Sequence, residues 1–267
     1  MPLAVCATPI GNLEDVTLRV LRELAEADFI LCEDTRHTRK LLERHGVRAR
    51  LLSYHQHNEA RRTAELLPRL GAGERMALVS DSGLPAISDP GARLVDAALE
   101  AGLIVTVLPG PSAVETALVA SGLAAEEGYQ FLGYLPRGER ALLSFAEEVA
   151  RHPWTVVAFE SPQRLPASLR VLARVIPDRP AAVCRELTKR FEEVARGSVS
   201  ELSRRFAAGV KGEIVLVLGE AAVSRDETAA AAAVAELLAA GVPRRQAADV
   251  VARLTGVARN RLYRTSL

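Results

Sequence analysis

The sequence predicts an α/β protein with two α/β domains, the first built on a parallel five-stranded sheet and the second on a mixed sheet, followed by a small helical module. Three observations lead to this prediction. Short apolar runs alternate with helical patterns over about the first 120 residues, the apolar runs then come closer together, and the end of the chain is helical throughout. We expect three domains, over residues 1–118, 119–222 and 223–267.

The first domain is expected to contain five buried strands separated by four helices. The helices are expected over residues 16–27, 35–45, 57–70 and 91–101, the first opened by Glu14 and Asp15. Runs of Val, Ile and Leu separated by amphipathic helices are typical of a parallel sheet covered on both faces. The expected strands lie within LAVCATP, DFILCED, RLLSY, RMALVSD and LIVTVLPG.

The second domain contains more closely spaced strands and fewer helices. Helices are expected at about 140–151, 163–175 and 198–208, and this pattern favours a mixed, largely antiparallel sheet. After a break in composition near residue 222, three helices are expected, to Ala240, through Leu254 and to Arg264, with glycine turns between them. This last segment is similar to a helix-turn-helix unit. The expected strands lie within TVVAFES, PAAVCREL, EEVARGSV and GEIVLVLGE.

The composition excludes several classes of protein. No apolar run approaches the ~20 residues of a membrane span, and no charged segment precedes the apolar residues at the start, so we expect no membrane partner and no secretion signal. Cys6, Cys32 and Cys184 are widely spaced in apolar surroundings and are expected to be buried free thiols of a cytoplasmic protein.

The charge is unevenly distributed, although the net charge is only +1. Residues 137–190 hold ten basic and six acidic side chains, and residues 223–267 hold seven arginines and four acidic side chains. A polyanionic partner would therefore be met by the later parts of the chain. The chain has only three lysines, so a lysine that is retained is a candidate for a point-charge function.

Three loops at the expected strand ends have sequences that suit close backbone approach to a ligand. They are ATPIGN, SDSGLPAISDPG and PGPSA, and none is a phosphate-binding loop. Asp81 and Asp89 would repel a phosphate, whereas a ligand with a cationic centre and a hydroxyl pair, such as S-adenosylmethionine, suits them. The alternative is three tight turns with helix-capping residues. We expect Asp81 to meet the ligand and Asp89 to cap the following helix.

Longer motifs identify a family. TPIGNLEDVTLR, EDTRHTRKLL, SYHQHNE, SDSGLPAISDPG, FESPQRL, RELTK and KGEIVLVLGE closely resemble the bacterial ribosomal RNA small-subunit methyltransferase I family, within the tetrapyrrole methylase superfamily. The resemblance implies S-adenosylmethionine as methyl donor and 2′-O-methylation of a cytidine ribose in the decoding region of 16S rRNA, in the small ribosomal subunit. It also implies a homodimer. The cofactor residues that it implies are Pro9, Gly11, Asp81, Gly83, Ile87, Ser88, Asp89, Pro109, Gly110, Pro111, Ser112, Ala113, Phe159, Glu213 and Ile214.

The reaction that this resemblance implies would need alignment of donor and acceptor and stabilisation of a developing alkoxide. The candidates are Lys189 as a stabilising cation, oriented by Glu186 or Glu192, and Asp34 or His37 near the acceptor. Lys189 could instead be a solvated surface lysine, and Asp34 could be the cap of the helix that begins at Thr35.

Basic and polar residues are the candidate RNA contacts, and aromatic residues make up only 4% of the chain, so arginines rather than stacking platforms are expected to dominate. Arg36, Arg39 and Lys40 share a helix with His37 and form either a phosphate-contacting edge or a solvated face. His55 and His57 lack the spacing of a metal site, and no metal is expected. The remaining candidates are Asn58, Arg137, Arg164, Arg185, Arg244, Arg245, Arg259 and Arg261.

Two other functions are compatible with the same residues. One is methylation of a tetrapyrrole or another small molecule, which the basic second half of the chain disfavours. The other is a DNA-binding regulator that reads a groove with its C-terminal helices, through Arg259, Asn260 and Arg261.

Overall fold

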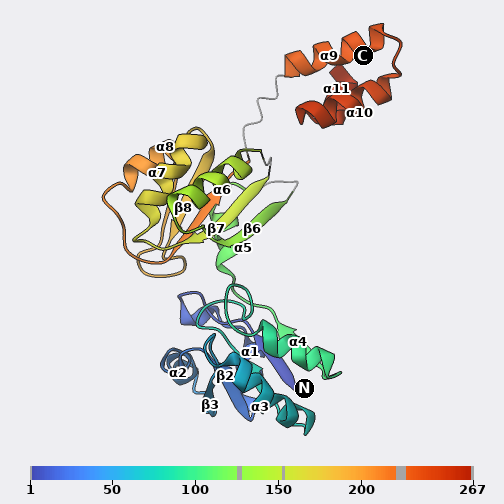
Figure 1. Cartoon of the computed structure of the whole chain (residues 1–267). Coiled ribbons are helices and arrows are strands. Elements are labelled where there is room, and N and C mark those ends of the chain that lie inside the picture. The colour runs from blue at the N-terminus through green and yellow to red at the C-terminus, as the bar shows by residue number, and fades with distance from the viewer. Residues whose placement is uncertain (1, 125–127, 152–153, 221–226, 266–267) are drawn as a thin grey trace.

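A computed structural model describes residues 2–124, 128–151, 154–220 and 227–265. Within these ranges the chain forms two five-stranded sheets with helices packed on them, and a group of three helices at the carboxyl end. Figure 1 shows the first sheet and its helices, in blue to teal, below the second sheet, in green to orange. The predicted fold class is confirmed.

The first sheet is parallel throughout, as predicted, with the strand order β3-β2-β4-β1-β5. Residue Leu3 of β1 lies between Met76 of β4 and Val105 of β5. Because all strands point the same way, the loops that follow them meet at one edge of the sheet. The strands are β1 (Leu3–Cys6), β2 (Phe29–Cys32), β3 (Leu51–Ser53), β4 (Met76–Leu78) and β5 (Val105–Leu108).

Helices cover both faces of this sheet, because successive side chains of a strand point to opposite faces. Leu3 and Val5 of β1 join a core with α3 and α4, whereas Ala4 and Cys6 join a second core with α1 and α2. Helix α1 begins two residues later than predicted, because Thr17 caps it by accepting a hydrogen bond from Val20 N. The helices are α1 (Leu18–Glu26), α2 (Thr35–Arg44), α3 (Glu59–Gly71) and α4 (Ala92–Glu100), with a short 3-10 helix η1 (Leu13–Asp15) before α1.

The second sheet is mixed, as predicted, with the order β6-β7-β10-β8-β9. Strands β6 and β7 pair in parallel, and the other neighbours pair antiparallel. Its strands are β6 (Tyr129–Tyr134), β7 (Thr155–Glu160), β8 (Pro180–Arg185), β9 (Glu193–Ser198) and β10 (Ile214–Leu218).

Different helices pack on the two faces of the second sheet. Helices α6, α7 and α8 cover one face, and α5 packs on the other, where Val114, Ala117 and Leu118 contact β8 and β10. The boundary expected at residue 118 therefore falls inside α5. The helices are α5 (Ala113–Ser121), α6 (Glu139–Arg151), α7 (Leu165–Val175) and α8 (Val199–Arg205).

The last three helices share a core of their own, made by residues such as Val234, Val251 and Leu262. They are α9 (Glu227–Ala239), α10 (Arg244–Thr255) and α11 (Arg259–Thr265), and Figure 1 draws them as a group beyond the second sheet. In the part of the chain that the structure describes, no helix has the length and apolar character to cross a membrane. The three cysteines are buried and free, as predicted.

Candidate active site

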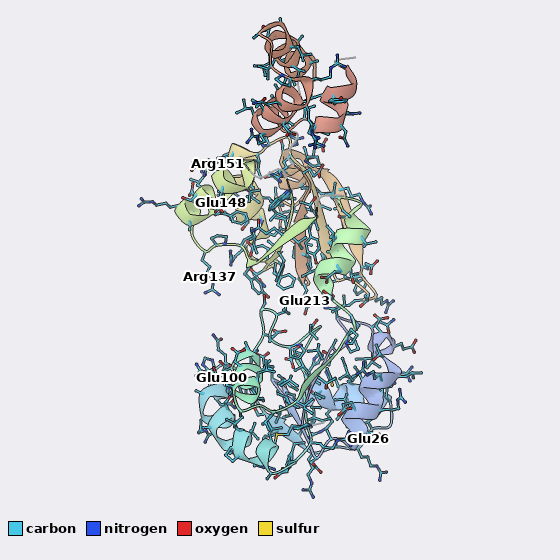
Figure 2. The ribbon with its side chains drawn as sticks, turned by 90° about the vertical axis from the view of Figure 1, so that its right-hand side faces the viewer. Glu26, Glu100, Arg137, Glu148, Arg151 and Glu213 are labelled. Carbon is cyan, nitrogen blue, oxygen red and sulfur yellow. The ribbon has the colours of Figure 1, made fainter. Side chains whose placement is uncertain are left out.

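A cleft of about 880 Å³ is lined by loops of the first domain and by strands of the second. Its volume lies in the range of roughly 300–1,000 Å³ that is usual for small-molecule sites. Glu213, which directly precedes β10, is one of the lining residues, and Figure 2 shows it at the end of the second domain that faces the first. The cleft is therefore built by both domains together.

Loops after β1, β4 and β5 form the first wall and fit closely against one another. Thr8 N donates to Gly83 O over 2.8 Å, and Gly83 N donates back to Thr8 O over 3.1 Å, so the first two loops are joined. Gly110, in the third loop, is packed against the first, because a Cβ on it would lie 2.9 Å from Ala7 Cβ. A side chain at residue 110 would push the loops apart.

The loop over residues 79–91 has an unusual backbone. Ala86 and Ser88 adopt left-handed conformations, with φ of 69° and 62°, in addition to Gly83 and Gly91. Such conformations cost non-glycine residues of order 1–3 kcal/mol each and cluster at functional sites. Here they accompany a turn in which consecutive residues, 87–89, line the cleft.

Aromatic side chains of the second domain form much of the opposite wall. The ring of Phe159 contacts Phe131 and Tyr134 edge to face, with centroids 4.9 and 5.5 Å apart. Tyr129 also lines the cleft, and Tyr134 is 61% exposed. Sequence analysis missed Tyr129, Phe131 and Tyr134. The signal was the segment YQFLGY, in which aromatic residues recur in a short strand.

The cleft is acidic. Four carboxylates line it, from Asp89, Glu115, Glu160 and Glu213, and no Lys, Arg or His is among its described lining residues. Burial raises the pKa of Asp89 to about 6, and the negative charges of Glu33 and Asp81 add to that effect, against a hydrogen bond from Ser80. A ligand that carries a positive charge is favoured over a phosphate in this environment.

Most of the residues that the family resemblance implied for the cofactor are gathered at this cleft. Three are not among the lining residues, namely Pro9, Gly11 and Asp81, although Ile10 between the first two is. The volume, the glycine-rich wall and the carboxylates fit a sulfonium-bearing nucleoside. The lining residues of the expected set are Gly83, Ile87, Ser88, Asp89, Pro109, Gly110, Pro111, Ser112, Ala113, Phe159, Glu213 and Ile214.

The two aspartates of the loop make different contacts, and the expected helix cap by Asp89 is not formed. Asp89 does not cap α4, whose N-cap is Gly91 without a side-chain hydrogen bond, and it lines the cleft instead. Asp81 Oδ1 accepts a hydrogen bond from Asp34 N over 3.2 Å and so joins the loop to the start of α2. The prediction that Asp89 caps the helix was wrong, because the left-handed backbone at Ser88 and Gly91 is not visible in the sequence.

Lys189 lies in a turn, residues 186–189, that contacts the first domain. Its Nζ is 3.0 Å from Glu186 Oε1 and 2.9 Å from Glu213 Oε2, which confirms the expected pairing with Glu186. Glu192 instead accepts from Thr188 N over 2.6 Å. The Glu213 amide and Lys189 hold the pKa of the Glu186 carboxyl below its usual range. Neither Lys189 nor Glu186 lines the cleft.

The same turn meets the loop after β1. Asn12 N donates to Thr188 Oγ1 over 2.9 Å. A Cβ on Gly11 would lie 2.5 Å from Lys189 Cγ, so the two segments are in tight contact. Glu186 and Thr188 both have positive φ, of 52° and 64°. The turn is therefore a strained connection between the domains, which we call the interdomain turn.

Asp34 caps helix α2, as one of its two expected roles required. Its Oδ1 accepts from Arg36 N over 2.8 Å, and the Arg36 guanidinium also binds both carboxylate oxygens. These bonds hold the pKa of Asp34 well below its usual range. His37 is exposed on α2, and neither it nor Asp34 lines the cleft.

The candidate RNA contacts fall into exposed and internally bonded groups. Arg36, Arg39 and Lys40 are exposed along α2, although Arg36 also pairs with Asp34, and His57 and Arg137 are exposed as well. In the loop after β3, Asn58 accepts from His55 N, and the two histidine rings are 5.9 Å apart. In the C-terminal helices, Arg245, Arg259 and Arg261 are exposed, and Arg244 lies over the Tyr263 ring.

Two of the expected RNA contacts have internal partners. Arg164 Nη2 donates to the carbonyl oxygens of Leu135 and Pro136, over 2.7 and 2.8 Å, and lies 3.2 Å from Glu160. Arg185 Nε donates to Glu193 over 2.9 Å. Both side chains are mostly buried and hold the second domain together. These two side chains were expected to contact RNA because their internal partners belong to other strands and loops of the chain.

Comparison with known proteins places this architecture in a class. The profile of the Tetrapyrrole (Corrin/Porphyrin) Methylases matches residues 2–203. Among solved structures, the methyltransferase CobJ superposes with a TM-score of 0.64 at 22% identity, covering 82% of this chain and 94% of the other. Diphthine synthase gives a TM-score of 0.63 at 14% identity, over 81% and 89% of the two chains. The fold and the cleft thus define a methyltransferase of the tetrapyrrole methylase type, with S-adenosylmethionine as the methyl donor.

More similar relatives narrow the class. Ribosomal RNA small subunit methyltransferase I of Mesorhizobium japonicum is 44% identical over 99% of this chain and 91% of its own length. The protein of that name from Mycobacterium tuberculosis is 44% identical over 98% and 93%. The profile of the RsmI C-terminal HTH domain matches residues 225–267. The chain belongs to the ribosomal RNA small subunit methyltransferase I family.

One further relative is shorter. The protein of the same name from Thermotoga maritima is 43% identical over 219 residues, which make up 97% of its length and 81% of this chain. Part of this chain therefore has no counterpart in that relative.

Proposed function

We propose that this chain transfers a methyl group to the 2′-hydroxyl of a cytidine ribose in 16S rRNA, in the decoding region of the small ribosomal subunit, in the cytoplasm. The names of the relatives support a ribosomal RNA substrate. The observation that carries the proposal is an acidic cleft with a basic edge beside it. The hydrogen bond from Asp34 N to Asp81 joins α2, with its exposed Arg39 and Lys40, to the loop that lines the cleft.

The two surfaces suit the two substrates. S-adenosylmethionine supplies a methyl group on a positively charged sulfur, which the cleft carboxylates attract. The polyanionic RNA is attracted to the exposed basic residues of α2 and repelled by the cleft carboxylates, so only a nucleotide turned out of its stack would enter. The protein then contributes alignment and exclusion of water.

The residues proposed to contact RNA are exposed or half-buried side chains. They lie on α2, on the loop after β3, at the start of α6 and on the C-terminal helices, and we set Arg164 and Arg185 aside as internal contacts. We propose Lys189 as a positioning residue that acts through Glu213, not as the cation that touches the acceptor. The proposed contacts are Arg36, Arg39, Lys40, His37, His55, His57, Asn58, Arg137, Arg244, Arg245, Arg259 and Arg261.

The packing of the helices also suggests where the domains begin and end. We propose a first domain that ends before α5, a second domain from α5 to β10, and a C-terminal module with its own core that holds the substrate. We also propose a homodimer. Large apolar side chains are exposed at Ile104, which precedes β5, and on β5, α5 and β6, at Val107, Val119 and Leu132, and a second copy of the chain would cover them.

The test is a transfer assay with methyl-labelled S-adenosylmethionine and three substrates: small ribosomal subunits, free 16S rRNA and duplex DNA. Digestion of the labelled RNA to nucleosides should yield 2′-O-methylcytidine as the labelled product. Label on a base or on another ribose would reject the proposed position. Absence of label from both RNA substrates would reject the function itself, and binding of duplex DNA without transfer would favour a regulator.

A further inference from the structure

Asp89 differs from the other carboxylates of the cleft in what it contacts. Glu160 accepts from Ser161 N and Ser168 and pairs with Arg164. Glu115 accepts from Ser112 and from the Tyr129 hydroxyl, the latter over 2.7 Å. Both of these carboxylates are already occupied as acceptors by neighbouring side chains.

Glu213 is also engaged, by Lys189 at 2.9 Å. Among the described residues, Asp89 pairs with no cation, and its one stabilising neighbour is the Ser80 hydroxyl. The Asp89 carboxylate is therefore the one among the four that no contact within the described ranges ties to a cation or to a neighbouring carboxylate's partners, and it keeps acceptor sites toward the cleft.

The surroundings of Asp89 come from both domains. Glu33, which follows β2, and Asp81, in the same loop, carry like charges near it, and Tyr134 of β6 lines the same cleft from the second domain. The strained residues Ala86 and Ser88 hold this part of the loop. A half-buried carboxylate that lines a ligand cleft and is not paired with a cation is suited to accept a proton from a bound substrate.

The other candidate bases either bind a neighbouring cation or lie outside the lining of the cleft. The Asp34 carboxylate is held by the Arg36 guanidinium and amide, and it lies outside the cleft lining. His37 is exposed on α2, also outside the lining. Glu186 is bound by Lys189 and by Glu213 N.

We propose that Asp89 is the general base of the methyl transfer, an inference that rests on the proposed 2′-O-methylation. The 2′-oxygen of the acceptor ribose forms a bond to the methyl carbon, and its O–H bond breaks with the proton passing to Asp89 Oδ. The methyl carbon–sulfur bond breaks, and its electron pair stays on the sulfur. The products are a methyl ether, S-adenosylhomocysteine and a neutral Asp89 carboxyl, which later releases its proton to water.

The charges change in a way that suits this acidic cleft. Before the reaction a carboxylate and a positive sulfur are present, and afterwards both are neutral. The burial and like charges that raise the pKa of Asp89 favour the protonated product. The base still ionises below neutral pH, so it is ready before each turnover.

The experiment compares Asp89→Asn with the wild-type protein and with Asp96→Asn, which makes the same chemical change at an exposed position of α4. Single-turnover methylation of small subunits should slow by ~10²–10⁴-fold in Asp89→Asn. The dissociation constant of S-adenosylmethionine, measured by calorimetry on the ligand-free proteins, should stay within about threefold in Asp96→Asn. In Asp89→Asn it should rise far less than the rate falls, by about tenfold at most, because one of the four cleft carboxylates is removed.

The pH dependence gives a second readout. An ionised base is required, so kcat/KM of the wild type should rise with pH and level off above about 6. In Asp89→Asn, this dependence of kcat/KM on pH should disappear. In the ligand-free protein, infrared difference titration should detect a carboxyl that ionises near this pH and disappears in the variant. Asp89→Glu should recover part of the rate, because it restores a carboxylate on a longer side chain.

Two outcomes would overturn the inference. One is a rate that stays within about threefold of wild type in Asp89→Asn. The other is a large loss of S-adenosylmethionine affinity with an unchanged single-turnover rate, which would make Asp89 a cofactor contact. The identity of the wild-type product is determined separately. Label on a nucleobase would reject the proposed function, whereas ribose labelling in Asp89→Asn at close to the wild-type rate would reject only the role of Asp89.

Discussion

The ammonium group of Lys189 forms ion pairs with two carboxylates. Glu186 and Glu213 lie within 3.0 Å of its ammonium group, and Glu213 lines the cleft. Thr188 joins the same interdomain turn to Asn12 of the first domain. Removal of the lysine charge would leave two carboxylates facing each other in a strained turn, and these would repel. This repulsion would displace Glu213, which lines the cleft, and the loop that contains Gly11, which packs against Lys189.

Lys189→Met is therefore expected to weaken S-adenosylmethionine binding by about tenfold and to lower the melting temperature, with a smaller effect on the single-turnover rate at saturating donor. Thr188→Val, which removes the hydrogen bond to Asn12, should change affinity and melting temperature in the same direction. Calorimetry, thermal unfolding and single-turnover kinetics measure the three quantities. A large loss of rate with unchanged affinity would instead assign Lys189 the role of stabilising the alkoxide.

Arg164 links two strands of the second sheet, joining the end of β7 to the segment that follows β6. Its guanidinium connects the end of β7, through Glu160, to the carbonyl groups of Leu135 and Pro136 that follow β6. Hydrogen bonds to charged groups contribute about 1.5–3 kcal/mol, and loss of the arginine would also leave Glu160 buried without its cation. Arg137 lies two residues beyond Leu135, and its side chain is exposed. The two arginines thus form a matched pair within one small region.

Arg164→Ala is expected to lower the free energy of unfolding by about 2 kcal/mol, whereas Arg137→Ala should leave it within about 0.5 kcal/mol of wild type. Arg137→Ala should weaken binding to small subunits, and Arg164→Ala should affect that binding only through stability. Urea unfolding and subunit-binding assays below the unfolding range test both. Equal stability of the two variants would show that Arg164 does not hold the loop after β6.

These elements also show how far the sequence determines the fold and the site. The strands of the first sheet and most helices could be predicted, because buried parallel strands and amphipathic helices have distinct periods. Strand β6 was missed because it lies at a sheet edge, contains Gly133 at φ 67° and has a register shift between Phe131 and Tyr134. Its aromatic contribution to the cleft was missed with it.

Within the site, the positions of the loops could be predicted from the local sequence. The partners of individual side chains could not, because several of them lie far away in the sequence. The glycine-rich loops follow parallel strands, so their meeting at one edge follows from topology. The loss of the expected helix cap at Asp89 accompanies left-handed residues in the loop, and Asp81 makes a contact with Asp34, 47 positions away in the sequence. The internal partners of Arg164 and Arg185 likewise lie on other strands and loops.

For the whole molecule, the exposed edges of the two sheets bear on assembly. Strand β5 ends the first sheet and β6 ends the second, and the apolar residues exposed near them include Ile104 at 65% and Val119 at 75% exposure. A second copy would bury this surface and protect both edges. Val119→Glu places a charge there and is expected to convert the dimer to a monomer, as measured by light scattering after size-exclusion chromatography. Leu18→Glu, at an equally exposed residue of α1, should remain dimeric, and a monomeric wild type would contradict the proposal.

We expect the cleft and the C-terminal module to have separate functions, the cleft in binding the methyl donor and the module in binding the substrate. The helices α9–α11 pack around their own core, and the described residues that line the cleft all lie between residues 10 and 215. The shorter Thermotoga maritima relative is consistent with a catalytic part that functions without some segment of this chain. A chain that ends at residue 222 retains β10 and Gly219, whose carbonyl binds Arg179. It should fold and bind S-adenosylmethionine with a dissociation constant within about threefold of the full chain.

The same truncated chain should bind small subunits at least tenfold more weakly, because it lacks the exposed Arg245, Arg259 and Arg261. The salt dependence of binding should also become shallower, since fewer phosphate contacts release fewer counterions. In the full chain, Arg245→Glu combined with Arg261→Glu should reproduce much of this loss without removing any helix. If the truncated chain loses S-adenosylmethionine affinity as well, the module supports the cleft and does not only hold the RNA. If subunit binding is unchanged in both proteins, α2 and its neighbours carry the RNA contacts by themselves.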